Sequence, residues 1–485
     1  MNRKEFVFNI CLLIFLNLLI KPFWILGIDI EVQNQVGAEA YGLYFALFNF
    51  TILFNMLLDM GITNFNSRNI AQNTRLLSKH LSHILTLKFA LGVLYLVVIL
   101  IAALIVGYQG YQLKLLLWMA FNQFLSAFVL YLRSNVAALL KFKIDSVLSV
   151  LDRVIMVLLC AVLLWGNLLK ESFRIEWFIA SQTVAYSFTA LIAFIVVLRN
   201  TDKFRLYWNF SFFRVLLKKS FPFAVLYLLM ACYNRIDSVM LERLLPDNVG
   251  AYQSGIYASA FRLLDAVVMI AYLFSVILLP LFSKMLKQRE NINPIVESAF
   301  QLLFFYSVTA VVILIYYAEP IFALLYDDHL TESLQVFPIL IACLIPISMV
   351  YVFGTLLTAN GNMRWLNFTS FLGIGVNVGL NLLLIPRLQA QGAAIVSLCT
   401  QSIVAISQII LAVKGLGLSV RRGVCWSCVS YIVLFVPIVG AILALCQERI
   451  SLALCISCVL AVLLAFLTRL LSFDFLKALI FRNKK

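Results

Sequence analysis

The chain has 485 residues, of which 63% are hydrophobic and only 12% are charged. An ordinary soluble domain is about 45–50% apolar and about 25% charged, so this composition excludes a water-soluble fold. The formal net charge of +15 comes from 37 Lys and Arg residues in short clusters between apolar runs, a pattern that argues against nucleic-acid binding.

Apolar runs of about 20 residues, the length that crosses a bilayer, recur along the whole sequence. Backbone polar groups must be satisfied internally in lipid, so we expect each run to be a helix. The first run follows a basic start but has no small-residue cleavage site, which indicates a retained helix. The expected spans are 6–28, 41–62, 81–106, 112–133, 148–168, 176–198, 219–241, 256–282, 295–318, 333–357, 365–386, 390–413, 424–445 and 450–472.

The positive charges indicate an orientation for these spans. Segments that join odd-numbered to even-numbered spans hold six Lys and Arg residues, the opposite side and its helix ends hold 27, and four lie inside spans. Lys and Arg accumulate on the cytoplasmic side of membrane proteins. We therefore expect both termini in the cytoplasm.

The sequence contains an internal repeat. Residues 36–44 read VGAEAYGLY and residues 249–257 read VGAYQSGIY, with five of nine positions identical at an offset of 213. The same offset maps the first span onto the seventh, which predicts that helices 1–6 duplicate helices 7–12 about an axis along the membrane normal. The expected fold is an all-α integral membrane protein of about 14 transmembrane helices. It would comprise an N-terminal six-helix lobe (1–213), a C-terminal six-helix lobe (214–415) and a final helix pair with a cytoplasmic tail (416–485).

Of the four cations inside the expected spans, Lys88 lies near a cytoplasmic end, and Lys21, Arg235 and Arg262 lie toward the outer side. A charge in a spanning helix costs at least ~2.5–3.5 kcal/mol on insertion scales, so each is a candidate functional residue. Counted at 1.5 Å per residue, all three lie roughly 9–10 Å below the outer surface. A basic patch at this depth suits an anionic substrate such as a phosphate, which arginine binds through two parallel hydrogen bonds. Structural alternatives stay open, because Lys21 could reach the headgroups and Arg262 could pair with Asp265.

Acidic residues supply the other candidates. Asp59 and Lys88 are expected near the cytoplasmic ends of the second and third spans, where they could pair as a gate or as a structural element. The three histidines, His80, His83 and His329, fall in expected loops or at the very start of a span. Proton coupling would therefore rely on a carboxylate, with Asp59, Asp237 and Asp265 as the candidates.

Two CxxC pairs, Cys425–Cys428 and Cys455–Cys458, have a spacing that can serve zinc or redox chemistry. They are expected near opposite ends of the last two antiparallel helices, roughly 20 Å or more apart, so they cannot share a metal. We expect them to pack as apolar side chains. The sequence has no phosphate-binding loop and no hydrolase motif, so we expect no metal, no cofactor and no catalytic activity.

Four features of the sequence resemble the polysaccharide flippases of the multidrug/oligosaccharidyl-lipid/polysaccharide exporter superfamily, in particular the Wzx-type exporters of O-antigen and capsule repeat units. The motif VGAEAYGLY precedes the second span, which ends at Asp59-Met-Gly. The charged seventh span reads FPFAVLYLLMACYNRIDSVML and is followed by VGAYQSGIY. The eighth span closes with the turn from Pro280 to Lys284.

This resemblance implies a two-lobed fold around a cationic cavity, to which Lys21, Arg235 and Arg262 would contribute. Such proteins translocate undecaprenyl-diphosphate-linked oligosaccharides from the inner to the outer leaflet by alternating access. The implied location is the bacterial inner (cytoplasmic) membrane, and the implied partners are the lipid-linked oligosaccharide diphosphate, membrane lipids and other polysaccharide-assembly proteins. We expect a monomer, since the two halves supply both lobes, and no nucleic-acid partner.

The predicted helix count differs from that of many O-antigen exporters, which have twelve spans. The related lipid II flippases have fourteen, and their last two helices form a groove for the lipid tail. A small-molecule antiporter of the same superfamily is the main alternative function, although multidrug antiporters usually expel cations and a basic cavity disfavours that. A glycan polymerase or ligase would resemble proteins with a large extracytoplasmic loop, which this sequence lacks.

Overall fold

The computed structural model describes residues 15–471 except 18, 64–65, 67–69, 71–75, 140, 167–171, 202–206, 209, 419–420 and 447–448. Within this part of the chain the secondary structure is helical and contains no strand, which confirms the predicted all-α class. Eleven of the described helices are long and apolar enough to cross a membrane. The first expected span, 6–28, and the C-terminal tail lie partly outside the described residues, and the count of fourteen stays a prediction.

The chain divides into two compact units, Met1–Ala258 and Ser259–Lys485. This division follows the contacts within each unit. The seventh expected helix, 219–241, belongs to the first unit because it packs along the helix of the second expected span, 41–62. The three-part division at 213 and 415 follows the repeat instead and remains a prediction.

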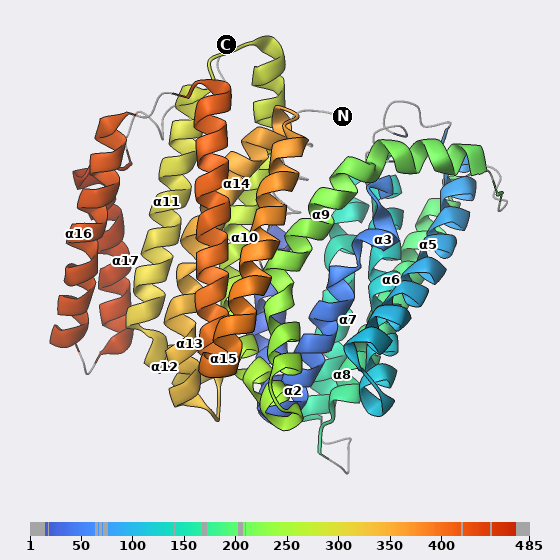
Figure 1. The fold of residues 1–485 in the computed structure, drawn as a ribbon, viewed down its shortest axis with the longest axis horizontal. Helices are drawn as coiled ribbons and strands as arrows, with labels where there is room; N and C mark the ends of the chain where they lie inside the picture. The colour runs from blue at the N-terminus through green and yellow to red at the C-terminus, as the bar shows by residue number, and fades with distance from the viewer. Residues whose placement is uncertain are drawn as a thin grey trace. The chain divides into compact units, whose positions relative to one another are not determined.

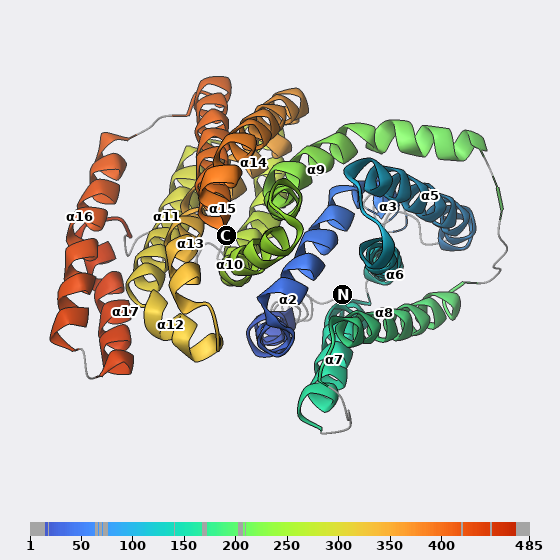
Figure 2. The ribbon, with the colours of Figure 1, turned by 60° about the horizontal axis from the view of Figure 1, so that its bottom comes forward.

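Helices of the first unit pack around a shared apolar core. They are η1 (Trp24–Asp29), α2 (Ile30–Leu53), α3 (Met56–Asp59), α5 (Leu76–Val106), α6 (Gly110–Ala138), α7 (Phe142–Trp165), α8 (Ile175–Leu198) and α9 (Phe210–Leu244). Helix α6 packs against α2 and α8, and α7 packs against α8. The long helix α9 runs along α2 (Figures 1 and 2).

The start of this unit differs from the sequence prediction. Residues 29–40 were expected to form a loop, but the chain is helical from residue 19 to Leu53. Gly37 (φ 81°, ψ 163°) divides this path into two helices, in a conformation that glycine adopts without steric cost. The predicted second span, 41–62, therefore begins directly after Gly37. Its regular helix ends at Leu53, followed by the one-turn α3 and left-handed backbone at Met60 (φ 45°) and Gly61 (φ 75°).

The second unit contains most of α10 and all of the later helices. Their bounds are α10 (Asp247–Gln288), α11 (Asn293–Tyr316), α12 (Ala318–Leu325), α13 (Leu330–Ala342), α14 (Leu344–Ala359), α15 (Met363–Leu416), α16 (Arg422–Leu445) and α17 (Ile450–Leu467). A straight helix of 54 residues would be roughly 80 Å long, far more than a bilayer core. Gln389 (φ 50°, ψ −131°) breaks α15 into two helices that correspond to the expected spans 365–386 and 390–413.

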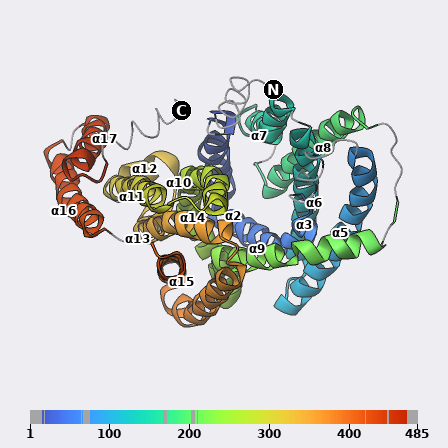
Figure 3. The same cartoon turned by 90° about the horizontal axis from the view of Figure 1, so that it is seen from above.

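The final pair of helices packs on α11 (Figure 3). The hydroxyls of Tyr431 on α16 and Thr309 on α11 are hydrogen-bonded at 2.7 Å, and the ring of Phe305 lies edge-on to Tyr431. On α17, Ser457 is hydrogen-bonded to Tyr317. The pair is thus a folded part of the second unit. Its four CxxC cysteines are free thiols.

The two copies of the repeated motif contact one another. A Cβ atom on Gly42 would lie 1.9 Å from the carbonyl oxygen of Ala251, and one on Gly255 would lie 2.0 Å from that of Ala38. Both pairs are equivalent at the offset of 213, so the contact is reciprocal. The Ser254 hydroxyl also donates a hydrogen bond to the Gly42 carbonyl. The glycines of the motif therefore allow two helix backbones to meet, as small residues do in membrane helix pairs.

Adding a methyl group at this crossing should destabilise the protein. We expect Gly42→Ala and Gly255→Ala each to cost about 1–3 kcal/mol, because the backbones must separate. Gly375→Ala is the matched control, since nothing lies within 4 Å of its added Cβ. It should be neutral or stabilising by up to about 1 kcal/mol, as alanine favours helix. Thermal unfolding in detergent measures the difference, and equal melting temperatures for all three variants would contradict the close crossing.

Candidate functional site

An ion pair forms where the second transmembrane helix is interrupted. Lys88 lies within α5 with a side chain that is only 2% exposed, and its Nζ is 2.5 Å from Oδ1 of Asp59. The same ammonium donates to the carbonyl of Leu58 at 2.9 Å and lies 5.6 Å from the ring centre of Tyr131. A lysine inside an apolar helix needs such partners, and the interrupted helix supplies a backbone carbonyl in addition to the carboxylate.

Local backbone geometry holds the carboxylate in place. The single turn of α3 ends at Asp59, and left-handed residues at positions 60 and 61 turn the chain back. The hydroxyl and the backbone N–H of Thr63 then both donate hydrogen bonds to Oδ1 of Asp59. Asp59 and Lys88, which the sequence placed near each other, are thus paired, while a gating role for the pair stays a prediction.

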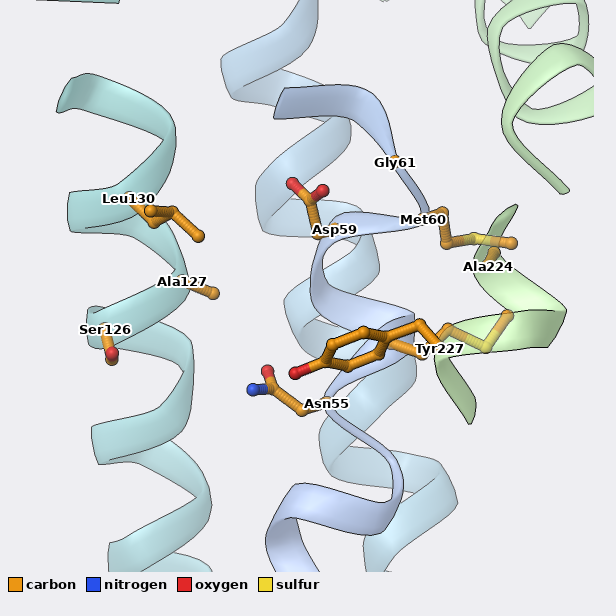
Figure 4. Close-up of a pocket in the computed structure, with 10 residues that line it drawn as sticks. Asn55, Asp59, Met60, Gly61, Ser126, Ala127, Leu130, Ala224 and Tyr227 are labelled. Atoms are coloured by element: carbon orange, nitrogen blue, oxygen red, sulfur yellow. The ribbon is translucent and has the colours of Figure 1, made fainter. Parts of the chain in front are cut away.

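A pocket of about 300 Å³ opens beside this ion pair, between α3, α6 and α9 (Figure 4). Its lining residues are Asn55, Met56, Asp59, Met60, Gly61, Ser126, Ala127, Leu130, Ala224 and Tyr227. In Figure 4 the Tyr227 side chain reaches from α9 across the helix interruption toward Asn55, and Ser126 lies on the opposite wall formed by α6. The pocket therefore combines polar groups from three elements with apolar walls.

The first unit also contains a cluster of cations around Lys21. Lys21 is half-buried and lies within electrostatic range of Arg153, Arg133 and Asp152. Arg133 is bound to Asp145 at 3.0 Å. We call Lys21, Arg133 and Arg153, together with Asp152 and Asp145, the cation cluster. It carries three positive charges against two negative ones.

The sequence analysis named only Lys21 among the members of this cluster. Of those that it missed, Arg153 is the most informative. The fifth span was expected to begin at residue 148, which placed Arg153 near a helix end, whereas α7 begins at Phe142 and carries Arg153 three turns into the helix. The sequence signal that could have identified it is the dipeptide Asp152-Arg153 within an apolar run. The revised helix start makes Arg153 an intramembrane charge of the same kind as Lys21.

Aromatic rings hold Arg153 in position. Its guanidinium lies 5.6 Å from the ring centre of Trp24 and 5.8 Å from that of Tyr186, and its Nε is 3.8 Å from Oδ2 of Asp152. Trp24 belongs to the π-helical turn η1, a type of helix distortion that is frequent at functional sites, and stacks on Phe178. The contacts to the rings are attractive cation–π interactions. The Arg153 side chain is 27% exposed.

Helix α6 links the pocket to the cation cluster. Ser126, a pocket residue, and Arg133, a member of the cluster, lie seven residues apart on this helix, which is about two turns and places them on the same face. The pocket and the cluster therefore neighbour each other along α6.

The remaining predicted site residues lie in two separate places. On α9, Asp237 is 1% exposed and accepts a hydrogen bond from the Tyr257 hydroxyl at 3.1 Å, while Arg235 is half-buried. Arg262 and Asp265 are half-buried on α10 within the second unit. Lys21 thus has Arg153 as its neighbouring cation, and the expected patch of Lys21, Arg235 and Arg262 stays a prediction.

Two buried carboxylates escaped the sequence analysis because they fell in expected loops. Asp29 is 1% exposed at the end of η1. Glu242 is 3% exposed near the end of α9, where it lies 2.8 Å from Nε of Arg243 and accepts a hydrogen bond from Tyr108. The Arg243 guanidinium also lies 3.7 Å from the ring centre of Tyr108. Glu242 and Arg243 form a closed structural cluster that joins α9 to the α5–α6 turn.

Solved structures share this multi-pass helical fold. The lipid II flippase MurJ in an inward closed conformation matches with a TM-score of 0.68 at 13% identity, covering 98% of this chain and 99% of that chain. An inward-facing multidrug resistance MATE family transporter of the MOP superfamily matches with a TM-score of 0.60 at 14% identity, covering 83% of this chain and 94% of that chain. A MOP superfamily transporter from Pyrococcus furiosus matches with a TM-score of 0.55 at 14% identity, covering 84% of this chain and 93% of that chain.

The sequence itself identifies the family. A model of the polysaccharide biosynthesis protein family matches residues 6–286, more than half of the chain, so the chain belongs to that family. A comparison with curated protein sequences gave no match. The predicted resemblance is confirmed by the family match and by the shared fold, and the solved structures that share this fold are those of flippases and transporters.

Breaking the buried ion pair should destabilise the protein asymmetrically. Asp59→Asn leaves an ammonium that is 2% exposed without its countercharge, which should cost about 3–5 kcal/mol. Lys88→Met should cost less, because the remaining Asp59 is 29% exposed and partly hydrated. The double variant should recover most of the loss. Thermal unfolding provides the measurement, and Glu297→Gln, which removes a surface pair with Arg421, is the control, expected within about 1 kcal/mol of the wild type. Equal losses in the two single variants would contradict this assignment.

Proposed function

We propose that this protein is a flippase that moves undecaprenyl-diphosphate-linked oligosaccharide repeat units from the inner to the outer leaflet for surface polysaccharide biosynthesis. The observation that carries the proposal is the cation cluster, in which Lys21 lies within electrostatic range of Arg133 and of the ring-held Arg153. Membership in the polysaccharide biosynthesis family and the MurJ-like fold support the same substrate class.

The chemistry of the cluster favours a diphosphate. Asp145 neutralises Arg133, and Asp152 lies at a longer distance from Arg153, so Lys21 and Arg153 retain an excess of positive charge. Arginine offers a planar pair of donors that match phosphate oxygens, and lysine adds a compact second charge. A diphosphate would bridge the two side chains and relieve their mutual repulsion.

The mechanism proposed is alternating access between two six-helix lobes. The diphosphate would bind the cations, including Arg235 and Arg262 as the contribution of the second lobe, while the lipid tail remains in the membrane. Asp59 with Lys88 would act as a gate, and Asp237 and Asp265 are the candidates for ion coupling. The reciprocal glycine crossing supports the proposed pseudo-twofold relation, and helices α16 and α17 would carry the groove for the tail.

The proposed setting is the bacterial inner membrane, with both termini in the cytoplasm and a monomeric transporter. The lipid-linked diphosphate and membrane lipids would be its partners, together with other polysaccharide-assembly proteins. An electric potential would act on any net charge carried, at about 2.3 kcal/mol per charge per 100 mV. A small-molecule antiporter with the same fold is the alternative, and the positive excess of the cluster disfavours the export of cations.

Neutralising the cluster should abolish transport without removing the protein from the membrane. We expect Lys21→Gln and Arg153→Gln each to slow flipping of a fluorescent polyprenyl-diphosphate oligosaccharide in proteoliposomes at least tenfold, equivalent to about 1.4 kcal/mol. Arg421→Gln is the matched control, because that side chain is 72% exposed, and it should flip at the wild-type rate.

The same assay separates the contributions of the other cations. Arg235→Gln and Arg262→Gln should also slow flipping if both lobes hold the diphosphate. Wild-type rates in Lys21→Gln and Arg153→Gln would contradict the proposed function, whereas wild-type rates in the other two variants would remove only those residues from the site.

A further inference from the structure

The pocket at the helix interruption is not needed to bind a diphosphate. Among the described residues that line it, the charged one is Asp59, whose charge is compensated by Lys88 at 2.5 Å. A pocket with a compensated charge attracts neither a phosphate nor an inorganic cation strongly. Its ligand should therefore be neutral and should make hydrogen bonds in several directions.

The lining has the two kinds of surface that a sugar ring needs. Asn55 offers an amide donor and acceptor, Ser126 a hydroxyl, and Asp59 a carboxylate acceptor, all suited to ring hydroxyls. The ring of Tyr227, which is 52% exposed, offers a flat apolar face to the C–H groups of a pyranose. The remaining walls come from methionine, alanine and leucine side chains.

The size of the pocket and its position beside the cation cluster indicate which part of the substrate it could bind. A volume of about 300 Å³ is at the lower end for small-molecule sites and has room for a single ring rather than a chain of sugars. Ser126 at the pocket and Arg133 in the cation cluster lie on the same face of α6, two turns or roughly 10 Å apart along the helix. A ring in the pocket would thus lie beside the group that is proposed to bind the diphosphate.

We propose that this pocket binds one sugar ring of the substrate, namely the residue nearest to the diphosphate. Tyr227 stacks on its apolar face, and Asn55, Asp59 and Ser126 bind its hydroxyls. This inference rests on the proposed function, because it assigns the glycan end of the same lipid-linked substrate. It makes the pocket a determinant of which first sugar the protein accepts.

Site-specific protection of an introduced cysteine tests the proposal. Leu130 lines the pocket and is 52% exposed, so Leu130→Cys on a cysteine-free background should react with a maleimide. A panel of methyl glycosides of common hexoses and N-acetylhexosamines serves as the probe. We expect at least one glycoside to slow labelling several-fold in a saturable manner, while inorganic pyrophosphate and sodium chloride leave the rate unchanged. Ala127→Cys provides a second labelling position if Leu130→Cys reacts poorly.

Variants of the pocket supply the matched controls. Tyr227→Leu and Asn55→Leu should lose the protection, whereas Tyr227→Phe, which keeps the ring, should retain most of it. Arg153→Gln should keep glycoside protection although it loses flipping. This difference distinguishes failure of the sugar site from failure of the proposed function, since the first is read from glycosides alone and the second from flipping alone.

Three outcomes would overturn the proposal. One is that no glycoside slows labelling at either cysteine position. Another is that pyrophosphate or a salt protects as well as a glycoside, which would assign the pocket to an ion. The third is full protection in a folded Tyr227→Leu variant, which would show that the glycosides act elsewhere. Size-exclusion chromatography establishes that each variant is folded.

Discussion

Every charge inside an apolar helix has to find its partners within the protein, because the surrounding lipid offers none. This constraint organises the first unit. The ammonium of Lys88 is satisfied by a carboxylate and by a backbone carbonyl beside the interruption of the second helix. Glu242 is satisfied by Arg243 and Tyr108. Arg153 is different, because rings and a more distant carboxylate hold it while its side chain stays 27% exposed. The satisfied charges are structural, and the accessible one is where we locate substrate binding.

Hydropathy was sufficient to predict most of the helices, because apolar runs of spanning length have one solution in lipid. It was insufficient where polar residues are helical. The segment 29–40 looked like a loop, yet it is helical on both sides of Gly37. For the same reason the predicted start of α7, residue 148, lies almost two turns after the observed start at Phe142, and Arg153 was not recognised as an intramembrane charge. The pairing of Asp59 with Lys88 could be anticipated from their similar expected depth, whereas the rings around Arg153 come from distant helices that no periodicity relates.

The repeated motif illustrates how a weak sequence signal acquires a physical meaning. Five identities in nine positions suggest duplication without saying why those residues are present. The contact of Gly42 with Ala251, and of Gly255 with Ala38, supplies the reason, since each glycine makes room for a backbone of the other copy. Two sites of different chemistry then lie in one unit, a cation cluster and a polar pocket, to which α6 contributes Arg133 and Ser126 respectively. This arrangement matches the two ends of a lipid-linked glycan head group, a diphosphate and its first sugar.

Equilibrium binding tests the central claim, that Lys21 and Arg153 bind the diphosphate, most directly. The measurement is the Kd of the full-length protein in nanodiscs for a radiolabelled polyprenyl diphosphate, compared with the Lys21→Gln/Arg153→Gln double variant at constant ionic strength. The account predicts that the double variant binds at least tenfold more weakly, a loss of about 1.4 kcal/mol or more, while the corresponding polyprenol binds both proteins equally weakly. An unchanged Kd in a folded double variant would contradict it.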